Sequence, residues 1–200
     1  MVTPDGLTLT CKQEEGVAEG KLRVLFTRED IREYVNELAL AVRRDYGDKN
    51  PLFLGVLKGS FVFLADLVRA VGFPLEVDLV RLASYGASTY SSGQVRMLLE
   101  PTIPVKGRHV LVVDDIVDTG ICLRYLLDYL ADKGTASLKV CVLFNKKERR
   151  QVQVRLDYVG AEVPDLFVVG YGLDFAERYR HLPDLCALEM QEDSGASQTR

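Results

Sequence analysis

The segment with the clearest chemical potential is Val110–Gly120, which reads VLVVDDIVDTG. An apolar run ends in two acids and then turns through Asp-Thr-Gly into a helix. Backbone N–H groups and a hydroxyl at a helix N-terminus suit a phosphate, because the N–H groups and the helix dipole both favour an anion. Asp114 and Asp115 would repel a phosphate, so we expect them to face sugar hydroxyls or a divalent cation such as Mg²⁺. The alternative is that Asp114–Asp118 only caps a helix.

Strands and helices alternate around this segment. Thr27 and Asp30 form a start like a capping box, with Asp in place of the usual Glu or Gln, and apolar residues at helical spacing predict a helix over Arg28–Arg44. Further helices are expected over 58–71, after a glycine turn, and over Cys122–Lys133, with Gly134 as C-cap. Short apolar runs predict buried strands at Pro51–Leu57, Glu76–Leu82, His109–Asp115, Leu138–Phe144 and Leu166–Val169.

This alternation predicts an α/β fold with a mainly parallel sheet that is covered by helices on both faces. Ligands of such sheets bind beyond the carboxyl ends of the strands. The polar segment Ala83–Gly107 interrupts the pattern, and a loop of this length in a compact domain is usually functional or disordered. No repeat or linker divides the chain, so we expect one domain over 1–200, with a variable segment over 1–20 and a disordered tail over 191–200.

The composition is that of a globular protein, with 48% hydrophobic and 27% charged residues among 200. Lys and Arg total 25 against 29 Asp and Glu, and the net charge of −4 argues against a nucleic-acid binder, which usually has a basic excess. No apolar run approaches the roughly 18 residues of a membrane span. The N-terminus shows no basic start followed by an apolar stretch, so we expect a cytoplasmic protein without a membrane partner.

The cysteines, Cys11, Cys122, Cys141 and Cys186, form no CxxC pair, so the spacing of a zinc site is absent. In a reducing cytoplasm they are expected to be free thiols. Cys141 lies in an apolar run, which favours a buried structural role.

The segment VLVVDDIVDTG resembles the phosphoribosyl pyrophosphate (PRPP) signature of the type I phosphoribosyltransferases. Three more segments narrow the resemblance to the hypoxanthine-guanine branch: LKGS at Leu57–Ser60, the pair Ser84–Tyr85, and PDLFVVGYGLDFAERYRHLP at Pro164–Pro183. All occur in the family's order, within about residues 24–186. The resemblance implies the type I phosphoribosyltransferase fold, a twisted sheet with a small hood and a mobile lid loop. It also implies purine salvage, in which hypoxanthine or guanine and PRPP give IMP or GMP and pyrophosphate.

The resemblance also implies which residues hold the phosphoribosyl group. The 5′-phosphate would be wrapped by Asp118, Thr119, Gly120, Ile121 and Cys122. Asp118 would also be the general base near N7 of the purine, a role worth roughly 10²–10⁴-fold in rate. Asp114 and Asp115 would hold the ribose hydroxyls, directly or near Mg²⁺, the implied cofactor.

The pyrophosphate would bind to the loop at Lys58 and Gly59, with a non-proline cis peptide at Leu57–Lys58, and to Arg180. A guanidinium suits a bidentate phosphate contact. From the residues alone, a solvated lysine after a strand is the favoured interpretation of Lys58, and a surface ion pair with Glu177 is the alternative for Arg180.

The purine would be bound by Lys146, Phe167, Val168 and Asp174. Phe167 would stack on the base, although its spacing also fits a plain core aromatic, and Val168 would read the base through its main chain. Lys146 would donate to O6, an acceptor that hypoxanthine, guanine and xanthine share and adenine lacks. Lys147 is adjacent, so the choice within the pair rests on the resemblance. Asp174 would reach a second Mg²⁺.

Ser84 and Tyr85 would belong to the lid, 83–107, which closes over the reactants and excludes water; the alternative is a plain disordered loop. Three positions depart from the common family pattern. Asp114 replaces a Glu, and the shorter acid keeps the role. Cys122 replaces a Thr, which removes a hydroxyl contact to the phosphate. Asn145 stands where relatives often have Asp or Val.

Two further functions stay open at this point. One is a PRPP-sensing regulator on the same fold that binds RNA, for which the basic cluster at 146–150 is the local argument. The other is a phosphoribosyltransferase that prefers xanthine. The family suggests a homodimer or homotetramer, while the ranking of the bases does not follow from the sequence.

Overall fold

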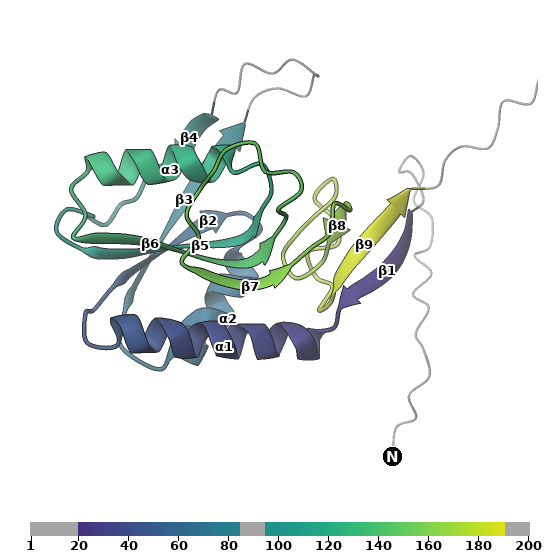
Figure 1. Ribbon diagram of the computed structural model, residues 1–200, viewed down its shortest axis with the longest axis horizontal. Coiled ribbons are helices and arrows are strands. Elements are labelled where there is room, and N and C mark those ends of the chain that lie inside the picture. The colour runs from purple at the N-terminus through teal and green to yellow at the C-terminus, as the bar shows by residue number, and fades with distance from the viewer. Residues whose placement is uncertain (1–19, 85–94, 191–200) are drawn as a thin grey trace, which may run out of the picture.

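The computed structural model describes residues 20–84 and 95–190 of the chain, which form an α/β fold (Figure 1). In chain order the elements are β1 (Gly20–Phe26), α1 (Arg28–Tyr46), β2 (Leu52–Leu57), α2 (Phe61–Val71), β3 (Glu76–Ser84), β4 (Val95–Leu99), β5 (His109–Val117), α3 (Ile121–Asp132), β6 (Ser137–Asn145), β7 (Tyr158–Glu162), β8 (Val168–Val169) and β9 (Leu185–Met190). No helix within these residues is long and apolar enough to cross a membrane.

The larger sheet has the strand order β4-β3-β2-β5-β6-β7, and every neighbouring pair is parallel except β3 with β4. From β2 the chain proceeds to β3 and β4 on one side, then returns to β5 beside β2 and continues to β6 and β7 on the other side. The strand order therefore reverses between β2 and β5. Ligands of open parallel sheets bind at such a reversal, beyond the carboxyl ends of the two strands.

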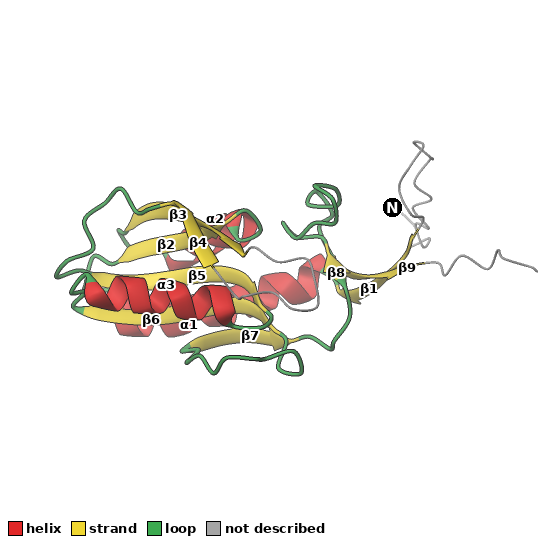
Figure 2. Ribbon diagram, turned by 90° about the horizontal axis from the view of Figure 1, so that it is seen from above, coloured by secondary structure: helices red, strands yellow, loops and turns green. Residues whose placement is uncertain are grey.

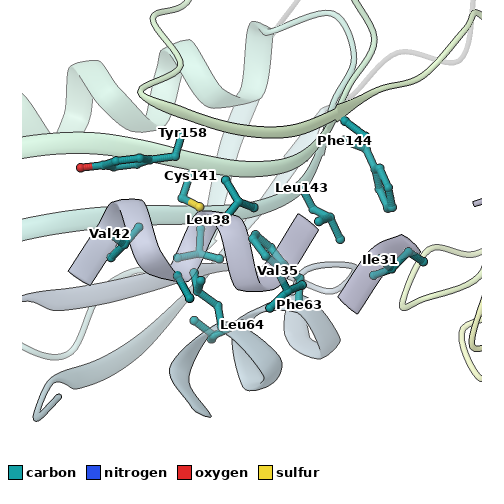
Figure 3. Close-up of a cluster of buried hydrophobic side chains, with 14 of the residues drawn as sticks. Ile31, Val35, Leu38, Val42, Phe63, Leu64, Cys141, Leu143, Phe144 and Tyr158 are labelled. Carbon is teal, nitrogen blue, oxygen red and sulfur yellow. The ribbon is translucent and has the colours of Figure 1, made fainter. Parts of the chain in front are cut away.

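Helices cover both faces of this sheet, with α1 and α2 on one face and α3 on the other (Figure 1). The face under α1 and α2 carries the larger apolar cluster, where Leu38 of α1 and Phe63 of α2 lie beside Cys141 and Leu143 of β6 (Figure 3). Cys141 is fully buried, which confirms its predicted structural role, and burial raises the pKa of its thiol. The cysteines in the described part of the chain form no disulfide bond.

The predicted capping box starts α1. The Thr27 hydroxyl accepts the Asp30 N–H at 3.2 Å, and the Asp30 carboxylate accepts the Thr27 N–H at 2.9 Å. The helix continues past the predicted end at Arg44 to Tyr46, because Tyr46 extends the buried face of the helix and is itself only 2% exposed. At the end of α3 the C-cap is Lys133, and Gly134 follows it with a φ of 73°.

A second, three-stranded antiparallel sheet has the order β1-β9-β8. Figures 1 and 2 both place it to one side of the larger sheet, near the end of β7. It is the small hood that the resemblance implies. The predicted strand Leu166–Val169 is shorter in the structure, where β8 comprises Val168 and Val169, which pair with Ala187 and Cys186 of β9.

The bounds that the sequence predicted for one loop and one strand were wrong. The segment Ala83–Gly107 is not one long loop, because β3 continues to Ser84 and Val95–Leu99 pairs with it as the edge strand β4. The strand expected to end at Asp115 continues to Val117, because Ile116 and Val117 still pair with β6. Asp114 and Asp115 therefore lie within the strand. Tyr85 and the expected tail 191–200 lie outside the described residues.

Candidate active site

The loops that follow β2 and β5 meet where the strand order reverses. Lys58 and Gly59 follow β2, and the peptide bond Leu57–Lys58 is cis, as predicted. A Cβ on Gly59 would lie 1.9 Å from Oδ2 of Asp115, so only glycine lets this loop lie against the β5 carboxylate. Residues from two distant parts of the chain therefore share one site.

Asp114 and Asp115 form an acidic pair on β5. Asp115 is 6% exposed, and its backbone N–H donates to the Asp114 carboxylate at 3.2 Å. Burial raises the pKa of both carboxyl groups, and the neighbouring Asp115 charge raises that of Asp114 further. The nearby Arg180 acts in the opposite direction on Asp115. Such a pair is stabilised by a cation or by hydroxyl donors.

The described residues contain no group of three or more His, Cys, Asp or Glu side chains that could hold a metal ion. Asp174 already binds Arg180 at 2.8 Å and accepts the Glu177 N–H at 2.9 Å. Mg²⁺ commonly binds through one or two carboxylates, with water and substrate phosphates completing the shell. The acidic pair on β5 fits that mode, since it offers carboxylates without a closed protein cage.

The turn from β5 into α3 leaves the N-terminus of α3 open. Gly120 has a φ of 83°, and a Cβ there would lie 2.6 Å from the Val152 carbonyl oxygen. The turn is anchored by the Thr119 carbonyl, which accepts the N–H groups of Gln151 and Val152, both at 3.0 Å. The N-cap residue Gly120 has no side chain to cap α3, and the Thr119 hydroxyl accepts the Ile121 N–H at 3.4 Å. Backbone N–H groups at a helix N-terminus suit a phosphate, as the sequence predicts.

Asp118 offers a carboxylate oxygen to this site. Within the described residues its Oδ1 atom is buried and has no hydrogen-bond partner, while Oδ2 lies 3.4 Å from Nη1 of Arg149. Buried polar atoms are nearly always paired in folded proteins. An unpaired buried oxygen here is ready to accept a proton or a hydrogen bond from a ligand.

Lys146 and Lys147 point to different environments. Lys146 is 5% exposed and donates to the Leu166 carbonyl at 2.6 Å, and burial lowers the pKa of its ammonium group. Lys147 is 65% exposed and pairs with Glu162. The structure therefore distinguishes the two lysines, which the residue pattern alone does not. The charge of Asp118 also acts on Lys146, which places the two groups in one region.

Phe167 is not a core aromatic, because its side chain is 49% exposed. Its ring packs edge-on against Phe175 at 5.4 Å between centroids, which fixes the orientation of the ring. The next residue, Val168, is buried in β8. The Lys146 ammonium group contacts the carbonyl of Leu166, the residue before Phe167. An exposed, oriented ring and a buried ammonium group linked in this way suit a flat heterocycle with a carbonyl.

The structure adds residues that sequence reasoning did not assign to the site. Arg150 donates to the Asp118 carbonyl at 3.0 Å and to the Asn145 side chain at 2.6 Å, and so holds the turn after β5. Glu177 contacts Lys58 at 2.6 Å and Arg180 at 3.0 Å. The ion pair between Arg180 and Glu177 is the one that the sequence spacing allowed. For Arg150 the only signal in the sequence is the basic cluster at 146–150.

Comparison with known proteins gives one family. The model of the phosphoribosyl transferase domain matches residues 27–176. The hypoxanthine-guanine phosphoribosyltransferase of Dictyostelium discoideum is 43% identical over 170 residues, which cover 83% of this chain and 94% of that protein. The enzyme of the same name from Bacillus subtilis is 42% identical over 167 residues, covering 84% and 93%.

Solved structures agree with the sequence comparison. A hypoxanthine phosphoribosyltransferase from Staphylococcus aureus superposes with a TM-score of 0.80 at 36% identity, covering 84% of this chain and 91% of that one. A hypoxanthine-guanine phosphoribosyltransferase from Bacillus anthracis also has a TM-score of 0.80, at 41% identity, and the match covers 84% of this chain and 99% of that one. The likeness thus extends over nearly the whole length of each relative.

Proposed function

The chain belongs to the phosphoribosyl transferase family, and we propose on that basis that it transfers the phosphoribosyl group of PRPP to hypoxanthine, guanine or both. The products are IMP or GMP and pyrophosphate, and the reaction is one of purine salvage. The observation that carries this choice of substrate is the buried ammonium group of Lys146 near the exposed ring of Phe167. It agrees with the names of relatives that match over nine-tenths of their length.

The base is bound by stacking and by one directed donor. Phe167 stacks on the purine, an interaction worth about 1–3 kcal/mol, and the main chain of Val168 reads the edge of the base. Lys146 donates to O6. Adenine has an amino group at this position, so its binding would leave a buried ammonium group facing another donor.

Asp118 acts as the general base. Its unpaired Oδ1 atom takes the proton from N7 while the bond between N9 and the ribose forms. The departure of pyrophosphate leaves positive charge on the ribose ring. Asp114 and Asp115 lie at the hydroxyl side of that ring and stabilise the charge electrostatically.

The 5′-phosphate and the pyrophosphate of PRPP bind at opposite sides of this centre. The 5′-phosphate is held by the backbone N–H groups over Asp118–Cys122, with Thr119 and Ile121 in that turn. The pyrophosphate contacts Lys58, Gly59 and Arg180. These are the loops that meet where the strand order reverses.

Mg²⁺ is the proposed cofactor, and when bound it would supply positive charge to offset that of the pyrophosphate. Asp114 and Asp115 would hold it with oxygens of PRPP, and Asp174 would contact a second ion beside the base. The acidic pair fits this role. Burial raises the pKa of both carboxyl groups, and a bound cation would favour their ionised forms.

An RNA-binding regulator is not favoured. The cations at 146–150 that carried this alternative are occupied within the protein. Lys147 pairs with Glu162, Arg149 lies near Asp118 and Asp165, and Arg150 holds the turn after β5.

A spectrophotometric assay with PRPP and Mg²⁺ tests the function, with hypoxanthine, guanine, xanthine and adenine offered in parallel. We expect turnover of 6-oxopurines and none of adenine. This assay also ranks the bases, and so tests a preference for xanthine. Absence of turnover with every base, while PRPP still binds, would contradict the proposal and favour a regulator.

We further propose that the chain assembles as a homodimer or homotetramer, as the family resemblance implies. Light scattering coupled to gel filtration measures this directly, and a mass of one chain would contradict it. The cytoplasmic location and the lid role of Ser84 and Tyr85 stay predictions from the sequence.

A further inference from the structure

Glu177 bridges the two cations of the proposed pyrophosphate subsite. Its Oε1 atom lies 2.6 Å from Nζ of Lys58, and its Oε2 atom lies 3.0 Å from Nη2 of Arg180. One carboxylate thus pairs with two cationic side chains that come from separate loops, the turn after β2 and the segment before β9. Each oxygen contacts a cation to which a phosphate oxygen could also bind.

Arg180 does not depend on Glu177 for its position. Its Nη1 atom donates to the Gly172 carbonyl at 2.8 Å, and its Nη2 atom lies 2.8 Å from the Asp174 carboxylate. Glu177 is held through its backbone, which has a φ of 63° and whose N–H donates to Asp174 at 2.9 Å. Removing the Glu177 carboxylate therefore leaves the guanidinium group in place.

The Glu177 side chain is easily displaced. It is 64% exposed, and the Lys58 side chain is 43% exposed. Ion pairs this exposed contribute little, because water and salt screen them and both side chains lose freedom. Lys58 and Arg180 lower the pKa of the Glu177 carboxyl, so this group stays ionised at neutral pH.

We propose that Glu177 is an internal counter-ion that competes with pyrophosphate for Lys58 and Arg180 and so weakens the retention of that group. The proposal rests on the proposed function and adds a residue that sets the affinity of one subsite. A pyrophosphate that enters must displace the carboxylate, since two anions cannot share the same cations without repulsion. When the product leaves, the carboxylate returns to Lys58 and Arg180 and offsets part of their charge.

Glu177 has two opposing effects on the binding of pyrophosphate, and the contacts of Arg180 show which effect is larger. The carboxylate orients the cations, which would favour binding, and it also occupies them, which disfavours binding. Because Arg180 keeps its other two contacts, orientation loses little when the carboxylate is removed. The variant Glu177→Gln should therefore bind pyrophosphate more tightly, by roughly three- to tenfold for the loss of exposed pairs.

Calorimetric titration of pyrophosphate with Mg²⁺ into the full chain measures this affinity. The matched control is Glu76→Gln, which removes an exposed carboxylate that pairs with Arg108 at 2.7 Å at the start of β3, the opposite end of the sheet. Both variants change the net charge equally. The KM for hypoxanthine is measured in parallel, since damage to the fold would alter it.

The expected result is a lower Kd for pyrophosphate in Glu177→Gln alone, with the KM for hypoxanthine within twofold of wild type. An unchanged or higher Kd in this variant would overturn the proposal, and so would equal tightening in Glu76→Gln. If the wild type transfers phosphoribosyl groups but Glu177→Gln binds pyrophosphate no more tightly, only this inference fails. If the wild type neither binds pyrophosphate nor turns over a base, the proposed function fails and this inference fails with it.

Discussion

Replacing Lys146 by methionine tests how the site reads the base. Methionine keeps an unbranched chain of similar size and removes the ammonium group, so the change acts on one donor and leaves little cavity. Lys146 is 5% exposed, and its contact with the Leu166 carbonyl at 2.6 Å holds the ammonium group in place. The same group can donate to O6 of a bound purine, because an ammonium group has three donors.

The size of the effect follows from the type of contact. A buried hydrogen bond to a charged group is worth about 1.5–3 kcal/mol. We therefore expect kcat/KM for hypoxanthine to fall roughly 10- to 150-fold in Lys146→Met. The loss for guanine should be similar, because both bases carry the same oxygen. The melting temperature should change little, since the variant also relieves the burial of a charge.

The adjacent lysine supplies the control. Lys147 is 65% exposed and pairs with Glu162, so Lys147→Met removes the same charge one position along the chain. Steady-state kinetics at saturating PRPP, with hypoxanthine varied, compares the two variants and the wild type. The reasoning is refuted if Lys146→Met stays within twofold of wild type, or if Lys147→Met loses as much.

Three further perturbations test other parts of the site and the fold. Asp118→Ala should lower kcat roughly 10²–10⁴-fold with a small change in the KM for PRPP, and near-full turnover would exclude Asp118 as the base. Gly59→Ala places a Cβ 1.9 Å from the Asp115 carboxylate, so the loop must shift. The KM for PRPP should rise, and the free energy of unfolding should fall by about 1–3 kcal/mol. A KM and a melting temperature equal to those of wild type would contradict this contact. Asp45→Asn removes a carboxylate that Lys139 contacts at 2.7 Å and whose pKa is lowered from 3.8 to about 2, chiefly by that hydrogen bond. The ionised Asp45 carboxylate stabilises the fold above pH about 4, and this contribution is lost as the pH falls towards 2. Denaturant titrations of Asp45→Asn should therefore show a free energy of unfolding up to about 1 kcal/mol lower at pH 7, and one that depends less on acid pH than in wild type.

Local patterns were sufficient for the central elements. Apolar runs occupy most of β2, β5 and β6 because both faces of these strands are covered, and a buried strand of this kind can be predicted from composition alone. The capping residues and apolar spacing of α1 predicted its start for the same reason, since both are interactions within one turn of helix. The acids and the turn of VLVVDDIVDTG likewise indicated a phosphate site before any fold was known.

The strands of the hood and the edge strands of the larger sheet could not be predicted from local sequence patterns. β1 and β9 pair with Gly20 opposite Met190, so neither strand is stable without a partner from the other end of the described chain. β4 and β7 are edge strands with a mixed burial pattern, which resembles that of a loop. Pairing of this kind depends on which segments the topology brings together, and strand propensity only weakly anticipates it.

What the sequence by itself determined is therefore the chemistry that the site contains: an acidic pair, a phosphate turn, two adjacent lysines and the resemblance that names their reaction. Only the tertiary structure decided which of these groups meet. It buried Lys146 and exposed Lys147, left Oδ1 of Asp118 without a partner among the described residues, and set Glu177 against Lys58 across 119 positions of sequence. The physical reason is that charge, burial and hydrogen bonding act through space, while the order of residues specifies directly only contacts within a few positions along the chain.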